Sequence, residues 1–341
     1  MTAIRIGLLG CGAVAELYYA PALRALEGAG RVEVAALTDV DPRRRIKLAR
    51  YFPNARQLEA LPAREEVDLA VVATPARWHA EHAITLLERR IGVLCEKPLA
   101  ASVADAERMI AAAASQRATL AVALIRRFLP AHRTLSRLVQ DDTFCALRQI
   151  AIQEGGPFNW PAATPSFFDQ RQAGGGVLLD VGVHVLDLLT WWLGDPVELD
   201  YADDAEGGLE ATCRIRLAFA RKGARVPASV LLSRDWKTSN TWTLEFERAT
   251  VLWHVGQADR IEIRPAGSST WLVARIEYLD TAGRHPSDSF SQAFTRQVLD
   301  AVEAVASSRL PTVTGEEALR SLRLIERCYA ARRPLGWEVI P

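Results

Sequence analysis

The sequence predicts an α/β protein in two parts, a parallel sheet covered by helices and then a mostly antiparallel sheet. Over residues 1–125, short apolar runs alternate with longer stretches whose apolar residues recur at helical spacing. This alternation is typical of β-α-β units, which build parallel sheets covered on both faces. Beyond residue 125, runs of alternating apolar and polar residues follow one another with turn residues between them, as antiparallel strands do. We therefore expect domains at 1–125 and 126–341.

The apolar pattern places each element of the first part in turn. Helices are predicted at 13–26, 42–51, 78–90 and 103–115, and strands at 4–9, 32–38, 69–73, 93–95 and 119–124. In the second part, helices are predicted at 130–139, 288–307 and 315–331, and strands at 144–154, 214–219, 229–233, 241–246, 250–254 and 260–264.

Composition excludes several classes of function. The 341 residues are 49% apolar and 24% charged, with a formal net charge of zero. General affinity for nucleic acid or an anionic membrane needs an excess of Lys and Arg, so we expect neither partner. The longest apolar stretch, 177–193, is interrupted by Asp180, His184 and Asp187, which argues against a membrane span. Five widely separated cysteines without a CxxC pair favour a reducing cytoplasm over disulfides or zinc.

A glycine-rich loop follows the first predicted strand. Gly10-Cys11-Gly12-Ala13-Val14-Ala15 fits the pattern G-x-G-x-x-G/A. In this pattern the first glycine permits a tight turn, the second lets a pyrophosphate approach the backbone, and the small third residue lets the helix pack on the strand. The helix that follows directs its free N–H groups at the anion. The context predicts a Rossmann domain that binds a dinucleotide.

Asp39 follows the second predicted strand, where an acid binds both hydroxyls of the adenosine ribose. A carboxylate there favours NAD, because it repels the 2′-phosphate of NADP. The nearby Arg43, Arg44 and Arg45 weaken that preference, so NADP remains possible. The alternative role for Asp39 is that of a helix cap.

Ionisable residues form a stripe along an otherwise apolar predicted helix in the second part. Asp180, His184 and Asp187 are spaced i, i+4, i+7 and share one helical face, while the other faces are Val, Leu and Trp. Because lone buried charges are costly, this face should line a cleft or an internal network. A carboxylate beside a histidine shifts the pKa of the imidazole toward neutral pH. Three hypotheses stay open: catalysis, a structural polar network, or a metal site.

Glu96-Lys97-Pro98 resembles the E-K-P motif of the glucose–fructose oxidoreductase and inositol dehydrogenase family, often called Gfo/Idh/MocA. The resemblance covers essentially the whole chain, in the same order. Its further parts are the loop at 10–15, Ala73-Thr74-Pro75 with His79, Arg127-Phe128, the segment 174–187, and 311–319.

The resemblance implies a Rossmann domain followed by an α/β domain with a large open sheet. Lys97, Asp180 and His184 match the family's catalytic trio, and the Lys97–Pro98 bond is often cis in relatives. His184 would be the general base, Lys97 would stabilise charge on the reacting oxygen, and Asp180 would orient them. The positions matching those that flank the cofactor are Thr74, Pro75, His79 and Glu96, together with Lys97.

The sequence departs from the family before the triple glycine. Many relatives carry Trp-Arg there, whereas this chain has Ser166-Phe167. An aromatic set occupies the region instead, and aromatic faces can stack on a sugar or cyclitol ring. The expected substrate residues are Arg127, Phe158, Trp160 and Phe168, with Phe167 in the same aromatic set.

The resemblance implies an NAD(P)-dependent dehydrogenase or reductase acting on a sugar, sugar derivative or cyclitol. Two alternatives are NAD-assisted glycoside cleavage on the same fold and a ligand-sensing regulatory protein without catalysis. No metal is expected, because no cluster of Cys and His supports one. Relatives often pair through the open sheet face. Tryptophans 236, 242, 253 and 271 on the strands would favour a partner, so a homodimer or homotetramer is expected, unless they pack under the domain's own helices.

Overall fold

The computed structural model describes residues 3–161, 174–206, 208–276, 278–280, 283–285 and 290–336. The contacts of the chain group into two compact units. The described part of the first unit comprises residues 3–125, 161 and 291–322, and the second unit comprises the remaining described residues. The predicted division at residue 125 stays a prediction about domains, since a C-terminal stretch groups with the N-terminal unit.

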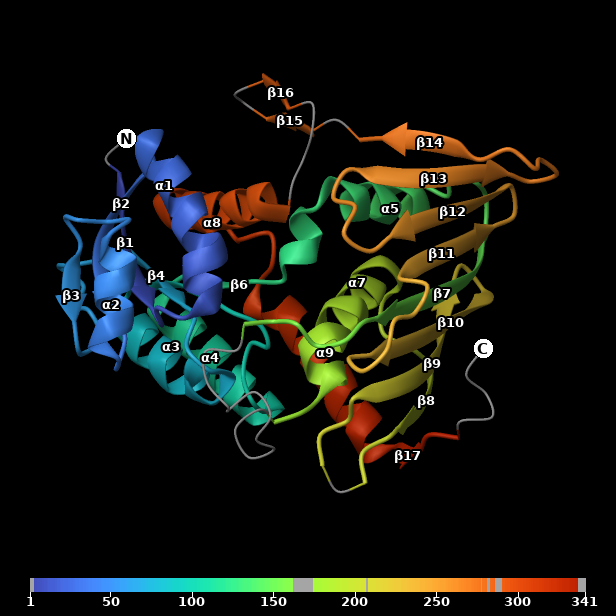
Figure 1. The fold of residues 1–341 in the computed structure, drawn as a ribbon, viewed down its shortest axis with the longest axis horizontal. Coiled ribbons are helices and arrows are strands. Elements are labelled where there is room, and N and C mark those ends of the chain that lie inside the picture. Colours follow the sequence, from blue (N-terminus) through green and yellow to red (C-terminus); the bar gives the residue numbers. More distant parts are fainter. Residues whose placement is uncertain are drawn as a thin grey trace. The chain divides into compact units, whose positions relative to one another are not determined.

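The first unit is built on a six-stranded, all-parallel sheet with the strand order β3-β2-β1-β4-β5-β6 (Figure 1). The strand order reverses between β1 and β4, the point at which open parallel sheets bind their ligands. The strands are Ile4–Leu9 (β1), Val32–Thr38 (β2), Arg56–Leu58 (β3), Leu69–Val72 (β4), Gly92–Cys95 (β5) and Leu120–Val122 (β6).

Helices join most of these parallel strands. A π-helical turn precedes the first α-helix, and a 3-10 turn precedes the third. Asp41 caps the second helix by accepting the Arg43 N–H at 2.9 Å, and Ser102 caps the fourth by accepting the Asp105 N–H at 3.1 Å. The helical elements are Ala15–Tyr19 (η1), Ala20–Gly28 (α1), Pro42–Ala49 (α2), Ala76–Trp78 (η2), His79–Glu88 (α3) and Val103–Gln116 (α4).

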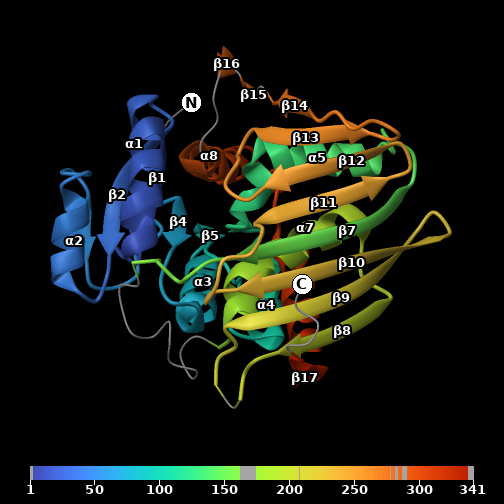
Figure 2. The ribbon, with the colours of Figure 1, turned by 45° about the vertical axis from the view of Figure 1, so that its right-hand side comes forward.

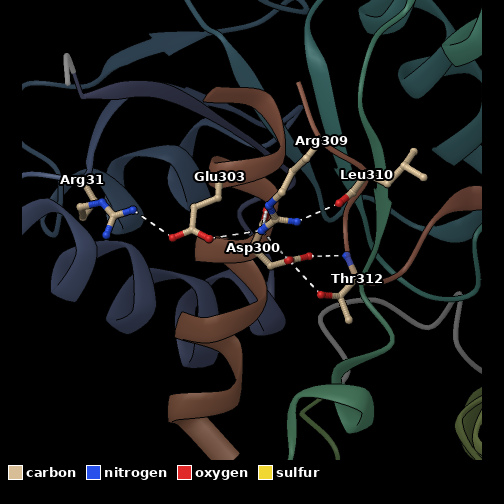
Figure 3. A network of polar contacts seen from close by, with 6 residues as sticks. All are labelled: Arg31, Asp300, Glu303, Arg309, Leu310 and Thr312. Carbon is tan, nitrogen blue, oxygen red and sulfur yellow. Dashed lines mark hydrogen bonds and ion pairs between the residues drawn. The ribbon is translucent and has the colours of Figure 1, made fainter. Parts of the chain in front are cut away.

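A polar network holds the late helix Phe290–Ser307 (α8) in the first unit (Figure 3). Asp300 accepts hydrogen bonds from the Arg309 guanidinium at 2.8 Å and from the Thr312 backbone N–H at 2.7 Å. Glu303, one turn further on, pairs with Arg309 at 3.2 Å and with Arg31 at 3.1 Å. The chain then forms a bridge from Thr314 to Ala121 of β6. These contacts explain why residues 291–322 group with the N-terminal unit.

The second unit is built on a nine-stranded mixed sheet with the order β14-β13-β12-β11-β7-β10-β9-β8-β17. The pairs β7–β10 and β8–β17 are parallel and the other pairs are antiparallel. A separate two-stranded ribbon is formed by Tyr278–Asp280 (β15) and Gly283–His285 (β16). The nine strands are Leu147–Gly155 (β7), Glu198–Asp203 (β8), Thr212–Arg221 (β9), Ala224–Ser233 (β10), Thr241–Phe246 (β11), Ala249–His254 (β12), Arg260–Pro265 (β13), Leu272–Arg275 (β14) and Arg332–Pro334 (β17).

The helices of the second unit lie on one face of this sheet, and Figure 2 shows α5 and α7 behind it. No helix in the described part of the second unit covers the other face, which is the open face that the family resemblance implies. The helical elements are Ile125–Phe128 (η3), Pro130–Gln140 (α5), Leu178–Gly182 (η5) and Val183–Leu193 (α7); the last helix of the chain is Gly315–Ala330 (α9).

For two of the four tryptophans, the alternative of packing under the domain's own helices is confirmed. Trp242 and Trp253 are almost fully buried, and Trp242 packs against both Trp253 and Trp192 of α7 on the helix-covered side of the sheet. Trp236 is half-buried, and Trp271 is partly exposed beneath the Arg264 guanidinium. The half-buried residues Ala151, Thr243 and Leu252 lie on the open face. The alternation of β11 and β12 therefore turns their largest side chains into the core and not toward a partner.

Candidate active site

The predicted cofactor residues of the first unit gather at the carboxyl edge of its sheet. Gly10 follows β1, Asp39 follows β2 and Glu96 follows β5. Backbone hydrogen bonds extend the sheet past these strand ends, from Gly10 N–H to Thr38 at 2.8 Å and from Glu96 N–H to Val72 at 2.9 Å. Because all six strands are parallel, their carboxyl ends place these residues along one edge.

Gly10 is required where it stands. Its φ is +87°, and a Cβ added there would lie 2.4 Å from the carbonyl oxygen of Ala73. The first backbone bond of the following helix runs from Glu16 N–H to the Gly12 carbonyl at 3.0 Å, so the N–H groups before Glu16 can face an anion. Ala13 and Val14 form the start of this helix, and the next residue, Ala15, is fully buried. The binding of a dinucleotide pyrophosphate by this loop stays a prediction.

Asp39 is held by the backbone around it. One carboxylate oxygen accepts the Cys11 N–H and the other accepts the Asp41 N–H, both at 2.8 Å. Asp41, not Asp39, caps α2, so the alternative role of Asp39 as a cap is wrong. Each carboxylate oxygen has a second lone pair, which leaves the group able to accept ribose hydroxyls.

The three arginines after Asp39 have acidic neighbours of their own. Arg43 pairs with Asp41 at 3.0 Å, and Arg44 lies 3.9 Å from the same carboxylate. Arg45 is buried, pairs with Glu59 at 3.2 Å and donates to the Asp39 carbonyl. These pairs absorb part of the positive charge that would attract a 2′-phosphate.

Glu96 fixes the backbone of Lys97. Its buried carboxylate accepts the Lys97 N–H at 3.0 Å and the Tyr19 hydroxyl at 2.7 Å, and the Gln297 amide donates to the Tyr19 oxygen at 3.3 Å. Burial raises the pKa of Glu96, and these donors and the Lys97 charge oppose the rise. The Lys97–Pro98 bond is cis, as the resemblance implies. The hydrogen bond from the Lys97 N–H to Glu96 fixes the backbone from which the Lys97 side chain projects.

His79 lies beneath the same edge and braces two loops. Its ring nitrogens lie 2.7 Å from the Thr74 carbonyl and 2.9 Å from the Pro98 carbonyl. Burial lowers the pKa of His79, so the neutral ring donates to one of the two carbonyls at a time. Thr74 also contacts His82 through its hydroxyl at 3.1 Å, and Pro75 is exposed beside it. His79 thus links the loop after β4 to the loop that carries Lys97.

In the second unit, the ionisable stripe divides into two parts. Asp180 lies in the π-helical turn η5 and is half-buried, while His184 lies in the first turn of α7 and is buried. Asp187 is buried against Arg127 and belongs to an internal ion pair. The structural-network hypothesis is therefore right for Asp187. No group of three or more His, Cys, Asp or Glu side chains suited to a metal ion occurs among the described residues.

Arg127 has a different neighbour from the expected substrate. Its guanidinium donates to Asp187 at 2.7, 3.0 and 3.2 Å, stacks over Trp191 at 5.1 Å, and is 2% exposed. Such a buried, bidentate pair fixes η3 to α7. The arrangement argues against a direct contact between Arg127 and a substrate.

The predicted aromatic set is described only in part. Phe158 donates its N–H to the Arg234 carbonyl at 2.8 Å, and the Arg234 guanidinium lies 6.0 Å from its ring. Trp160 is half-buried like Phe158, so both rings keep accessible surface. Phe167 and Phe168, with Ser166, lie outside the described residues.

Sequence reasoning missed several residues that shape these sites. Tyr19 and Gln297 are far from Glu96 in sequence and carry no motif. Arg126 forms a second, partly buried pair, donating to Glu154 of β7 at 2.5 and 2.7 Å, while Trp242 also donates to Glu154 at 2.7 Å. The only local sign of such ion pairs in the sequence was the two successive arginines after the last predicted parallel strand. Their acidic partners come from elements that the sequence does not link to them.

Comparison with known proteins matches the chain in two parts. Residues 4–124 match the model described as oxidoreductase family, NAD-binding Rossmann fold, and residues 158–337 match its C-terminal alpha/beta domain. The chain is 29% identical over 337 residues to the rhizopine catabolism protein MocA of Rhizobium meliloti, covering 96% of this chain and 94% of the relative.

Two solved structures share the fold. A levoglucosan dehydrogenase in complex with NADH and levoglucosan has a TM-score of 0.84 at 16% identity, covering 96% of this chain and 97% of its own. A 3-ketoreductase from Actinomadura kijaniata with NADP and TDP-benzene has a TM-score of 0.79 at 21% identity, covering 98% and 99%. Among the described residues, no helix has the length and hydrophobicity to cross a membrane.

Proposed function

Because the chain belongs to the oxidoreductase family with the NAD-binding Rossmann fold, we propose that it transfers a hydride between nicotinamide and a sugar-like substrate. The reacting group is a secondary hydroxyl or ketone of a sugar, sugar derivative or cyclitol. One solved structure with this fold is a levoglucosan dehydrogenase and another is a 3-ketoreductase, so both are named for oxidation or reduction of a hydroxyl or ketone. The observation that carries the proposal is Lys97, held by Glu96 at the carboxyl edge where the glycine loop also lies.

The cofactor would be held by residues of the first unit. The dinucleotide supplies the hydride acceptor when oxidised and the hydride donor when reduced. The backbone of the glycine loop and the helix start would bind the pyrophosphate, and Asp39 would bind the adenosine ribose. The residues after β4 and β5 would contact the nicotinamide end. The residues concerned are Gly10, Gly12, Ala13, Val14, Ala15, Asp39, Thr74, Pro75, Glu96 and Lys97, with His79 positioning the loops.

NAD is the preferred cofactor in this proposal. The Asp39 carboxylate is fixed by two backbone N–H groups and cannot easily turn away from a 2′-phosphate. Arg43 and Arg44 have Asp41 as an acidic neighbour, and Arg45 has Glu59. These acids reduce the positive charge that a 2′-phosphate would meet, and the Asp39 carboxylate repels it.

Three side chains would perform the chemistry. His184 accepts the proton of the substrate hydroxyl, and returns it in the reverse reaction. Lys97 donates a hydrogen bond to the same oxygen and stabilises the negative charge that develops on it. Asp180 orients His184 or Lys97 and balances the charge. Lys97 belongs to the first unit and Asp180 and His184 to the second, so the proposal requires residues of both units.

Phe158 and Trp160 are proposed to contact the ring of the substrate, since aromatic faces stack on the C–H face of sugars.

Two further expectations concern the oligomeric state of the protein and its place in the cell. The open sheet face remains the candidate surface for a homodimer or homotetramer, which light scattering coupled to size-exclusion chromatography would reveal. Localisation in the cytoplasm remains a prediction from the five scattered cysteines, four of which are buried.

The test is absorbance at the reduced-nicotinamide band with a panel of sugars, sugar acids and inositols, using NAD and NADP separately in both directions. Lys97→Ala should lower turnover at least about 100-fold while the dissociation constant for NAD changes little. Lys222→Ala, at the exposed β9–β10 turn, is the matched control and should keep full turnover. Near-full turnover by Lys97→Ala on a proven substrate would refute the assignment, and no binding of either dinucleotide would refute the proposal as a whole.

A further inference from the structure

The helix that carries Asp180 and His184 has its start capped by a residue distant in sequence. Glu210 accepts the N–H groups of Gly176 and Leu178 on one carboxylate oxygen, at 2.9 and 3.1 Å. Its backbone carbonyl accepts the N–H of Val177 at 2.9 Å. The helix has no side-chain cap of its own at Val177. Three successive orphan N–H groups of a buried helix end are thus satisfied by one residue.

Glu210 is itself held firmly. Its side chain is 1% exposed, the Tyr329 hydroxyl donates to it at 2.8 Å, and the Arg332 guanidinium lies 3.5 Å away. Arg332 also pairs with the buried Asp203 at 2.7 Å. A carboxylate at a helix N-terminus is stabilised by the helix dipole as well as by these donors. The negative charge is therefore compensated, and its position is determined from several directions.

The glycines before the helix have a packing explanation in this arrangement. A Cβ at Gly176 would lie 2.0 Å from the Glu210 carbonyl oxygen, and a Cβ at Gly175 would lie 2.3 Å from the Tyr329 hydroxyl. Neither position therefore admits a side chain while Glu210 and Tyr329 stay in place. The glycine run lets Glu210 and Tyr329 approach the helix start closely.

One further hydrogen bond connects the helix start that Glu210 caps to Asp180. The Gly176 carbonyl accepts the Asp180 N–H at 3.1 Å, while the Gly176 N–H is bound by Glu210. Asp180 lies in the π-helical turn η5, and His184 lies in the first turn of α7 that follows. A shift of the helix start would therefore move Asp180 first and His184 with it.

We infer that Glu210 is a positioning residue for hydride transfer, acting by fixing the start of the Asp180–His184 helix; this inference rests on the proposed function. Glu210 touches neither substrate nor cofactor in this role. Loss of Glu210 should lower kcat and change the pH dependence of kcat/KM. The reason is that a displaced Asp180 carboxylate would interact differently with the His184 imidazole. Loss of Glu210 should leave the dissociation constant for NAD unchanged, since the dinucleotide loop belongs to the first unit.

The experiment compares Glu210→Gln and Glu210→Ala with Glu198→Gln, the same change at an exposed glutamate on β8 that pairs with Arg225. The measurements are kcat, KM and the pH profile on the substrate found in the panel, the dissociation constant for NAD, and hydrogen exchange at residues 176–178. We expect kcat to fall about tenfold or more in Glu210→Ala, with faster exchange at 176–178. Glu210→Gln keeps an acceptor oxygen and should recover part of the rate.

Circular dichroism establishes that each variant is folded, and Tyr329→Phe serves as a second variant that removes one donor to Glu210 and leaves the backbone contacts in place. It should lower kcat about two- to threefold, in line with the loss of one hydrogen bond within a larger set. Folded Glu210→Gln and Tyr329→Phe proteins with the original kcat and pH profile would overturn the inference. Lys97→Ala separates the two hypotheses. If it keeps full turnover, the proposed function fails; if it loses turnover while the Glu210 variants keep theirs, only the role of Glu210 fails.

Discussion

The guanidinium of Arg127 and the carboxylate of Asp187 face each other through parallel hydrogen bonds of 2.7 and 3.0 Å, with side chains 2% and 1% exposed. Asp187 is thereby separated in function from Asp180 and His184, although the three residues share a stripe in the sequence. The pair holds η3 against α7, the helix that bears His184. Its energetic effect depends on whether one partner or both are removed.

Removing one partner of this ion pair should be far more harmful than removing both. Arg127→Met and Asp187→Leu singly should each lower the free energy of unfolding by about 3–5 kcal/mol, because each leaves a buried charge without its counter-charge. The double variant should lose much less than the sum of the two. A double-mutant cycle measured by urea unfolding checks this. Additive losses would contradict the prediction.

The hydroxyl of Tyr19 should stabilise the first unit through Glu96. Tyr19→Phe removes the donor to Glu96 and the acceptor of the Gln297 amide, both in buried surroundings. We expect a loss of about 1–3 kcal/mol in the free energy of unfolding, because the variant leaves buried polar groups without their partner. Tyr51→Phe is the control, since Tyr51 is partly exposed. Equal stability of both variants would show that the Tyr19 hydroxyl contributes nothing.

His132 should make stability depend on pH. Its ring is 0% exposed and lies 4.3 Å from Trp253, and neither ring nitrogen has a hydrogen-bond partner among the described residues. Burial, assisted by the charge of Arg126, lowers the pKa of His132 well below 6.5. Below about pH 6.5 the unfolded chain therefore binds a proton that the folded chain does not, and stability falls as the pH falls.

The variant His132→Leu removes that proton-binding difference. Relative to the original protein, its free energy of unfolding should rise by about 1.4 kcal/mol for each pH unit below about 6.5, and the difference should be constant above pH 8. Denaturant unfolding at several pH values measures it, and the other histidines contribute equally to both proteins. A difference that does not change with pH would contradict the prediction, because it would mean that His132 has the same pKa in the folded and unfolded states.

Gly10 and Gly30 form a matched pair for testing the dinucleotide loop. Both have a left-handed φ, +87° and +67°, but an added Cβ meets the Ala73 carbonyl at Gly10 and nothing within 4 Å at Gly30. Gly30→Ala should lose only the backbone term, about 1 kcal/mol, and bind NAD normally. Gly10→Ala should in addition displace the loop and weaken NAD binding at least about tenfold. Calorimetric titration with NAD decides, and equal affinity in both variants would contradict the loop assignment.

Elements with a strong apolar pattern were predictable from the sequence, and short polar ones were not. The predicted strands at 4–9, 32–38 and 241–246 coincide with β1, β2 and β11. The strands β3, β8, β14 and β17 and the ribbon β15–β16 were missed, and all but β8 are short. The first four lie at or next to a sheet edge, and the side chains of β3, β14 and β17 are mostly exposed, so no apolar periodicity marks those three.

The candidate site shows the same limit. The glycine loop, Asp39 and the Glu96–Pro98 motif were visible because their chemistry depends on local spacing. The partners of Glu96, Arg127 and the helix start at Gly176 come from 77, 60 and 34 residues away. Nothing in a local window indicates such pairs. The direction in which Trp242 and Trp253 face was equally hidden, because alternation gives a strand two faces without saying which one is covered.

The placement of residues 291–322 in the first unit has a consequence for how the protein is made. A ribosome delivers the chain from the N-terminus, and domains usually fold in the order in which they emerge. Here the Asp300 network and the bridge from Thr314 to β6 cannot form until nearly the whole chain has been synthesised. The nascent N-terminal unit therefore waits for its last helix while eight of the nine strands of the second sheet are translated. Any attempt to express the nucleotide-binding half alone should append the segment 291–322 to residues 3–125.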